Sequence, residues 1–315
     1  MSARDPLPPA DEADDEVAAP RGNLGARLAV ATLRLLSGWP LGLQAALGRG
    51  LGAALWRLAG KRRRIALRNL ALCLPERSEA ERQAIARAHF GWLARSLLER
   101  GLLWFAPRER LKTLIEIEGD VGYAERAGQP VMWLVPHFVG LDVAGVATQL
   151  FQGRQVASIY QAQSNPVFDA AMRAGRLRFD QGQIFARSES ALPLVRAVRR
   201  GAVFFNLPDM DFGTRDAAFV PFFGVAAATL LAPARMARSL RMTVQPVVAE
   251  MLPGGRGYRV RFLEPWTDFP GEQSDEQATA RMNAWIEQEI RRVPEQYLWV
   301  HKRFKSRPPG EPSLY

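Results

Sequence analysis

Short apolar runs that alternate with helical segments constrain the fold of this chain more than any other feature. Strand-like runs occupy residues 115–119, 130–136, 155–160, 202–208 and 243–251. Helical patterns separate several of them, at 141–151, 166–179 and 191–200. Strands that alternate with helices predict a layered α/β fold with a mostly parallel or mixed sheet flanked by helices. The run at 257–266 adds a late strand that could pair antiparallel, and a final amphipathic helix is expected over 276–296.

A long helix is predicted before the first strand, over residues 78–105. Ser78 with Glu81 three positions later has the pattern of a capping box, which satisfies free backbone N–H groups at a helix start. Ile85, Phe90 and neighbouring leucines then recur near the helical period. His89 lies within this stripe and is interpreted as structural.

The composition limits the possible cofactors and partners. The 315 residues contain one cysteine, Cys73, which excludes disulfides and cysteine-based metal sites. Three histidines leave little material for a zinc centre, although a carboxylate-rich metal site remains possible. The net charge of +10 favours an anionic partner, such as nucleic acid, anionic lipid or an acidic protein.

The N-terminal region changes character twice before the α/β pattern begins. Residues 1–22 are acidic and proline-rich, which predicts a disordered tail. Residues 23–60 are apolar, but their longest charge-free stretch, 35–48, has 14 residues, fewer than the ~20 that a helix needs to span a bilayer. We expect one or two helices in the membrane interface. A tilted or re-entrant span and a pair of ordinary core helices are the alternatives.

A basic stretch follows the apolar segment. Residues 61–69 contain five cations in nine positions, a juxtamembrane polybasic pattern that places this side of the membrane in the cytoplasm. A solvated basic helix face would have the same composition. Residues 23–69 are therefore predicted to be a membrane-associated region, and residues 70–315 to be one domain.

His137 is the main candidate for chemistry, because it follows a buried strand and Asp142 comes five positions later. On one continuous helix the two side chains would lie about 140° apart and could not meet. We therefore expect His137 in a loop and Asp142 in the first turns of the next helix. The carboxylate could then accept the Nδ1–H of the imidazole and leave Nε2 as a base. Taken alone, the pattern also fits a structural histidine.

Two further polar clusters follow later strands. The loop after 202–208 contains Asp209, Asp211, Gly213 and Arg215, which could bind a polar headgroup or a cation, or form a turn with Gly213 at positive φ. The segment 160–182 contains arginines that suit phosphate or carboxylate binding, although a solvated helix face is the alternative.

The order of these blocks resembles the glycerolipid acyltransferase superfamily, with HxxxxD, a basic block, a Pro-acid-Gly-Thr-Arg loop and a proline-bearing strand. The third block reads LPDMDFGTR and departs from the commoner FPEGTR form. RNLALCLPE at 68–76, NPxxD and GRLR near 165–178, FVPFFG and the C-terminal tail resemble a narrower family, the late acyltransferases of lipid A synthesis. This resemblance covers nearly the whole chain from about residue 24.

The resemblance implies a function for the domain 70–315. It implies transfer of an acyl chain, lauroyl or myristoyl, from an acyl carrier protein thioester to a hydroxyl of a lipid A precursor. His137 would be the general base and Asp142 its orienting acid, without metal, cofactor or nucleic acid. The expected location is the cytoplasmic face of the inner membrane, in contact with its lipids. The implied substrate-binding residues are Asn165, Arg176, Arg178, Asp209, Asp211, Gly213 and Arg215.

Three alternatives to this function follow from the same residues. An acyltransferase for another acceptor, a lysophospholipid or a glycolipid, would use the same base. A thioester hydrolase would need no basic headgroup site. A non-catalytic protein that binds nucleic acid or anionic membranes would use the basic charge alone.

Overall fold

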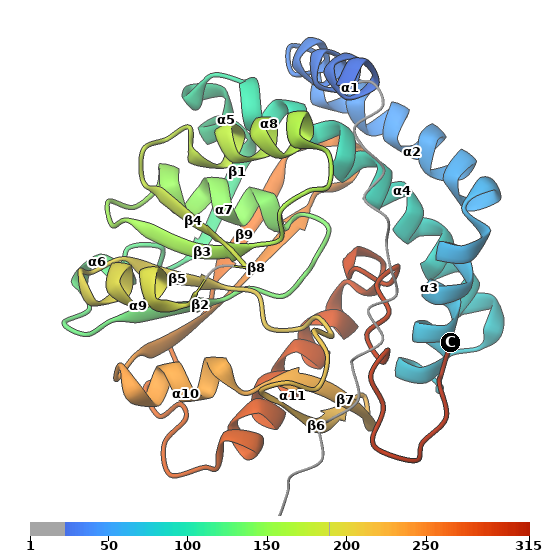
Figure 1. Ribbon diagram of the computed structural model, residues 1–315. Helices are drawn as coiled ribbons and strands as arrows, with labels where there is room; N and C mark the ends of the chain where they lie inside the picture. Colours follow the sequence, from blue (N-terminus) through green and yellow to red (C-terminus); the bar gives the residue numbers. More distant parts are fainter. Residues whose placement is uncertain (1–22, 189) are drawn as a thin grey trace, which may run out of the picture.

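A computed structural model describes residues 23–188 and 190–315, so the tail predicted at 1–22 lies outside the described residues. Its main sheet has seven strands in the order β1-β9-β8-β2-β5-β3-β4 (Figure 1). All neighbouring strands pair in parallel except β8 and β9, which are antiparallel. The strands are β1 Ile115–Gly119, β2 Val131–Leu134, β3 Val156–Tyr160, β4 Gly182–Ala186, β5 Val203–Asn206, β8 Thr243–Met251 and β9 Tyr258–Phe262. The α/β prediction and the antiparallel late strand are confirmed.

Helices cover both faces of the sheet and one of its ends (Figure 1). The N-terminal helices are α1 Asn23–Leu36, α2 Leu41–Leu58, α3 Gly60–Cys73 and α4 Glu79–Phe105. The helices within the α/β region are α5 Arg108–Leu114, α6 Tyr123–Arg126, α7 Leu141–Leu150, α8 Pro166–Leu177, α9 Leu192–Arg199, α10 Ala232–Ser239 and α11 Asp275–Arg292. A separate hairpin joins β6 Ala217–Phe222 to β7 Val225–Leu230. Sequence analysis missed this hairpin and the edge strand β4.

The central strand β2 shows why the fold has three layers. All four of its residues are buried, as expected for a strand with helices on both faces. Because side chains alternate along a strand, Met132 and Leu134 join the core under α9, α10 and α11, whereas Val131 and Trp133 join the core under α7 and α8. One sheet thus separates two apolar cores.

The helix α4 begins at the capping box that the sequence predicts. Ser78 accepts a hydrogen bond from the backbone N–H of Glu81, and the Glu81 side chain accepts one in return. His89 is fully buried, and its Nδ1 lies 3.2 Å from the carbonyl oxygen of Glu295. Burial lowers the pKa of His89 to about 4, so its imidazole is neutral at pH 7. The structural interpretation of His89 is therefore confirmed.

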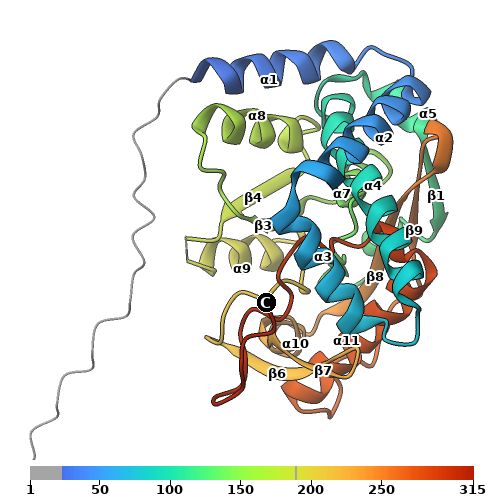
Figure 2. The same cartoon turned by 90° about the vertical axis from the view of Figure 1, so that its right-hand side faces the viewer.

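The predicted apolar region 23–60 forms α1 and α2, which pack on α4 (Figure 2). Gly48 and Gly52 of α2 lie against the α4 backbone, where a Cβ at position 52 would come within 2.5 Å of Gly91. Neither helix buries its outer side. Most of the large apolar side chains that remain exposed in the described residues are on these two helices or the turn between them, at Leu24, Leu28, Leu35, Trp39, Leu43, Leu47, Leu51 and Leu58. Among residues 23–188 and 190–315, no helix is both long and apolar enough to span a bilayer.

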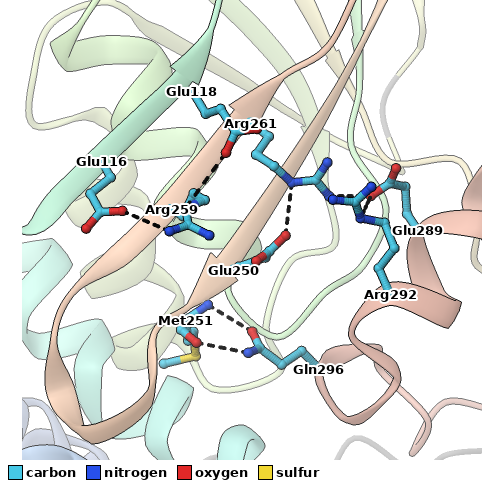
Figure 3. A network of polar contacts seen from close by, with 9 residues as sticks. All are labelled: Glu116, Glu118, Glu250, Met251, Arg259, Arg261, Glu289, Arg292 and Gln296. Atoms are coloured by element: carbon cyan, nitrogen blue, oxygen red, sulfur yellow. Dashed lines mark hydrogen bonds and ion pairs between the residues drawn. The ribbon is translucent and has the colours of Figure 1, made fainter.

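A polar network fastens the C-terminal segment to the sheet (Figure 3). Arg261 on β9 bridges Glu250 on β8 and Glu289 on α11. Beside it, the Gln296 amide pairs with the backbone of Met251, accepting from its N–H at 2.8 Å and donating to its oxygen at 2.9 Å. These bonds fix the position of the segment that begins at Tyr297, which contacts the candidate site.

Candidate active site

His137 lies three residues beyond the end of β2, in the loop that precedes α7. The loop position predicted for it is confirmed, and Asp142 lies in the first turn of α7 as expected. The Leu298 N–H donates to the His137 carbonyl at 3.0 Å, so the C-terminal segment holds the backbone of this loop. The side chain is 12% exposed, so it is largely buried but retains some contact with solvent.

Asp209 is the partner of His137. One carboxylate oxygen lies 2.7 Å from the imidazole Nδ1, and the other accepts from the His137 backbone N–H at 2.9 Å. Two contacts to one residue fix the rotation of the ring. A carboxylate at Nδ1 keeps the proton there, and Nε2 is then free to accept another proton. The carboxylate at the imidazole therefore belongs to Asp209, not to Asp142 as the sequence predicts.

The strand register explains this pairing. β2 and β5 run parallel, with Leu134 opposite Asn206. His137 lies three residues after Leu134, and Asp209 lies three residues after Asn206. The two residues therefore follow neighbouring strand ends and lie side by side. Their separation of 72 residues hides the contact from any local pattern in the sequence.

Asp142, the predicted partner of His137, instead binds two arginines. Its carboxylate accepts from the Arg176 Nη2 at 2.6 Å and Nε at 3.0 Å, and lies 3.4 Å from the Arg100 Nε. The reason is its place on α7, where the first turn directs the side chain toward α8 and α4. Burial opposes ionisation, but the charges of Arg176 and then Arg100 outweigh it and keep the pKa of Asp142 below its usual value.

Asp209 is ionised although it is fully buried. Desolvation raises the pKa of Asp209. The charge of the nearby His137 and the hydrogen bonds from it outweigh this effect and, with a smaller contribution from Arg303, bring the pKa below the usual range. Tyr297 also hydrogen-bonds Asp209; burial, and then the charge of Asp209, raise the pKa of its hydroxyl well above the usual value. Tyr297 therefore stays protonated as a donor.

His301 is a second histidine near this pair, and sequence analysis did not select it. Its Nε2 accepts from the Asp211 backbone N–H at 3.2 Å. Burial, and then the charges of His137 and Arg303, lower the pKa of His301 to about 4. It is therefore neutral at pH 7, and an Nδ1–H tautomer fits the hydrogen bond at Nε2. No acid follows His301 at the five-residue spacing that selected His137, so the sequence pattern did not identify it.

The loop after Asp209 has a structural role that the sequence left open. Asp211 accepts from the Gly213 N–H at 2.9 Å, the Ser306 N–H at 2.6 Å and the Ser306 hydroxyl at 2.9 Å. Gly213 has a φ of +93°, as the turn interpretation predicts. Arg215 is 97% exposed and approaches only Asp216 among the described residues. Substrate contact for these three residues stays a prediction.

The remaining predicted binding residues also make structural contacts. Asn165 caps α8, accepting from the N–H groups of Val167 and Phe168 at 3.0 and 3.2 Å. Arg178 donates to the carbonyl oxygens of Leu103 and Ala106 and so ties the end of α8 to α4. Arg176 differs from both, because it lies at the wall of a pocket.

An apolar pocket lies beside the site, between α4, α7 and α8 on one side and β3, β4 and β5 on the other. Its apolar lining includes Leu103, Trp104, Val146, Ile184, Phe205 and Leu207. Asp142 and Arg176 line it as well. An apolar cavity with a few convergent polar groups suits a ligand that is mostly hydrocarbon. The lining does not include His137 or Asp209; Leu207, two residues before Asp209, is the point of the lining nearest to that pair in the sequence.

Comparisons with known proteins agree with this geometry. The family described as bacterial lipid A biosynthesis acyltransferase matches residues 13–306. Three similar proteins from Escherichia coli (strain K12) are each 34% identical to this chain. The lipid A biosynthesis lauroyltransferase and palmitoleoyltransferase each align over 85% of this chain and 87% of their own length. The lipid A biosynthesis myristoyltransferase aligns over 84% of this chain and 82% of its own.

Proposed function

The chain belongs to the bacterial lipid A biosynthesis acyltransferase family, and we propose that it moves a fatty acyl chain from an acyl carrier protein thioester to a hydroxyl of a lipid A precursor. The observation that carries the catalytic part of this proposal is the bond between His137 Nδ1 and Asp209 at 2.7 Å. It supplies the base that such a transfer requires.

His137 acts as the general base in this proposal. Its Nε2 removes the proton of the acceptor hydroxyl as the hydroxyl oxygen attacks the thioester carbonyl carbon. The tetrahedral intermediate then collapses, the C–S bond breaks, and the imidazolium returns the proton to the departing thiolate. The products are an ester and the free thiol of the carrier protein, so no acyl-enzyme forms. Asp209 replaces Asp142 as the residue that orients His137 and stabilises its cation.

Asp142 has a different role, which is to hold Arg176 and Arg100. Arg176 uses its Nε and Nη2 on Asp142, whereas its Nη1 has no hydrogen bond within residues 23–188 and 190–315. We propose that this remaining donor face binds an anionic group of the substrates, since a guanidinium matches phosphate and carboxylate oxygens. The acyl chain would occupy the adjoining apolar pocket.

Membrane association in this proposal is interfacial. The exposed leucines of α1 and α2 would enter the headgroup boundary of the inner membrane from the cytoplasmic side. In Figure 2, α1 lies beside α8, the helix whose Arg176 lines the apolar pocket. A lipid acceptor could then reach His137 without leaving the membrane surface.

The test is an acyl-transfer assay with purified full-length protein. A lipid A precursor is incubated with lauroyl, palmitoleoyl and myristoyl carrier protein thioesters, and the products are weighed by mass spectrometry. We expect a mass gain of one acyl group for at least one donor, and loss of that product in His137→Ala. Transfer to a lysophospholipid but not to the lipid A precursor would refute the acceptor. Unchanged transfer by folded His137→Ala would refute the base.

A further inference from the structure

A groove on the opposite flank of α2 from the leucines has features that the acyl-transfer site does not use. It has a volume of about 640 Å³ and lies between α2, α4 and the β8–β9 turn. Its apolar lining includes Ala45, Ala53, Ala88, Gly91 and Trp92. Gly91 forms an open part of its floor, because a Cβ added there would meet nothing within 4 Å.

Three arginines line the groove, and its lining contains no acid. Arg49 and Arg87 are exposed, and neither has a carboxylate partner in the described part of the chain. Arg95 is buried and pairs with Glu99, and its Nη1 donates to the Leu252 carbonyl at 2.5 Å. The Arg95 Nη2 has no hydrogen-bond partner among residues 23–188 and 190–315. The pairing with Glu99 leaves Arg49 and Arg87 as the uncompensated charges of the groove.

The helix geometry relates this groove to the leucine flank. Arg49 lies two residues from Leu47, about 200° around α2, so the two occupy opposite flanks. Gly48 and Gly52 face α4, and they lie between the leucine flank and the arginine flank of α2. The outer side of α2 is the side opposite these glycines, and it is bordered by the same two flanks. A bilayer against that outer side would meet leucines along one edge and arginines along the other. Cations at such an edge lie at the level of lipid phosphates.

We propose that this groove binds an anionic phospholipid, with its phosphate at Arg49 and Arg87 and the upper part of an acyl chain over Gly91 and Trp92. Charge complementarity and the apolar floor favour this occupant over a soluble anion, which would gain nothing from alanines and an indole. The site would set the depth and rotation of α2 at the membrane surface. The proposal does not depend on acyl transfer, so it can fail while the proposed function stands.

The test compares binding of the full-length protein to vesicles of phosphatidylcholine with and without phosphatidylglycerol, measured by flotation. Arg49→Gln with Arg87→Gln should weaken binding to the anionic vesicles about twenty-five-fold, since each cation at an anionic surface contributes about fivefold. The matched control is Arg199→Gln with Arg241→Gln, which removes two exposed charges elsewhere and should retain most of the affinity. Equal losses in the two double variants would show a bulk charge effect and overturn the proposal.

A second pair of variants tests the apolar floor without changing the charge. Gly91→Leu fills the groove, whereas Gly50→Leu adds the same side chain on open surface at the outer side of α2. We expect Gly91→Leu to lose the preference for anionic vesicles, and Gly50→Leu to keep it, with both proteins folded by circular dichroism. Wild-type preference in Gly91→Leu would overturn the proposal. So would a thermal stabilisation by inorganic phosphate equal to that by phosphatidylglycerol, because the groove would then be a site for free anions.

Discussion

Replacing Asp209 by asparagine separates the two carboxylates near His137 more sharply than any other substitution. The carboxylate accepts from the His137 backbone N–H with one oxygen and from Nδ1 with the other. An amide has only one oxygen. The backbone N–H is always a donor, so the amide oxygen must face it at 2.9 Å, and the NH₂ group must then face Nδ1.

The consequence of Asp209→Asn is a change of tautomer. Facing an NH₂ donor, Nδ1 becomes an acceptor and the ring proton moves to Nε2, which can no longer act as a base. The variant also lacks the negative charge that stabilises the imidazolium. Loss of an oriented general base reduces turnover by about 10²–10⁴-fold, which corresponds to about 3–5 kcal/mol in the activation barrier.

The assay for Asp209→Asn is steady-state acyl transfer to the lipid A precursor, with kcat and KM measured separately and the fold checked by thermal melting. Asp142→Asn is the matched control, because it removes one charge nearby but leaves the His137–Asp209 pair intact. We expect Asp209→Asn to lower kcat, and Asp142→Asn chiefly to raise KM through displaced Arg176. Near-wild-type kcat in Asp209→Asn, with a loss above a hundredfold in Asp142→Asn, would refute the assignment.

Three further changes test other parts of the structure. Leu43→Gln, Leu47→Gln and Leu51→Gln together should leave the melting temperature unchanged and weaken vesicle partitioning about a hundredfold. The three side chains are 40–47% exposed, and transfer of the exposed part of each into the membrane contributes about 1 kcal/mol to binding. Gly52→Ala should destabilise the chain by about 1–3 kcal/mol in urea titrations, because its Cβ would meet the Gly91 backbone, whereas Gly50→Ala should be neutral or stabilising. His89 has a folded pKa of about 4, below the ordinary 6.5, so the unfolded chain binds more protons and stability falls as the pH drops from 6.5 toward 4. The loss should reach about 2 kcal/mol at pH 5, and His89→Gln should abolish this component of the pH dependence.

The sequence predicted the strands best where burial is two-sided and least where it is one-sided. β2 and β5 read as continuous apolar runs because helices cover both of their faces. The edge strand β4 contains a glycine and has no fully buried residue, so its composition resembles a loop. The β6–β7 hairpin is rich in alanine and contains Pro221, which lowers its strand propensity; its pairing with α11 and the C-terminal segment is a tertiary effect.

The partner of His137 could not be read locally, because it depends on which strands are neighbours. The chain order places β3 and β4 between β2 and β5, yet the sheet places β2 directly beside β5. Only that adjacency, with Leu134 opposite Asn206, brings the two loops together. The HxxxxD spacing correctly placed His137 in a loop and Asp142 on α7, but it carried no information about the direction of the Asp142 side chain.

The two carboxylates have separate roles because each is buried against a different kind of cation. A buried carboxylate needs a compensating charge, and a permanently charged guanidinium provides it at every working pH. The charge of Asp142 is compensated in this way by Arg176 and Arg100, so its stabilisation does not depend on the protonation of His137. Asp209 instead lies against a group that gains and loses a proton during the proposed reaction. While His137 is neutral, its backbone N–H, the Tyr297 hydroxyl and the charge of Arg303 stabilise the carboxylate. Its stabilisation is therefore greatest when His137 is protonated, which is the state that follows proton transfer from the acceptor. A carboxylate in that position favours the charged intermediate over the resting enzyme, whereas Asp142 favours both equally.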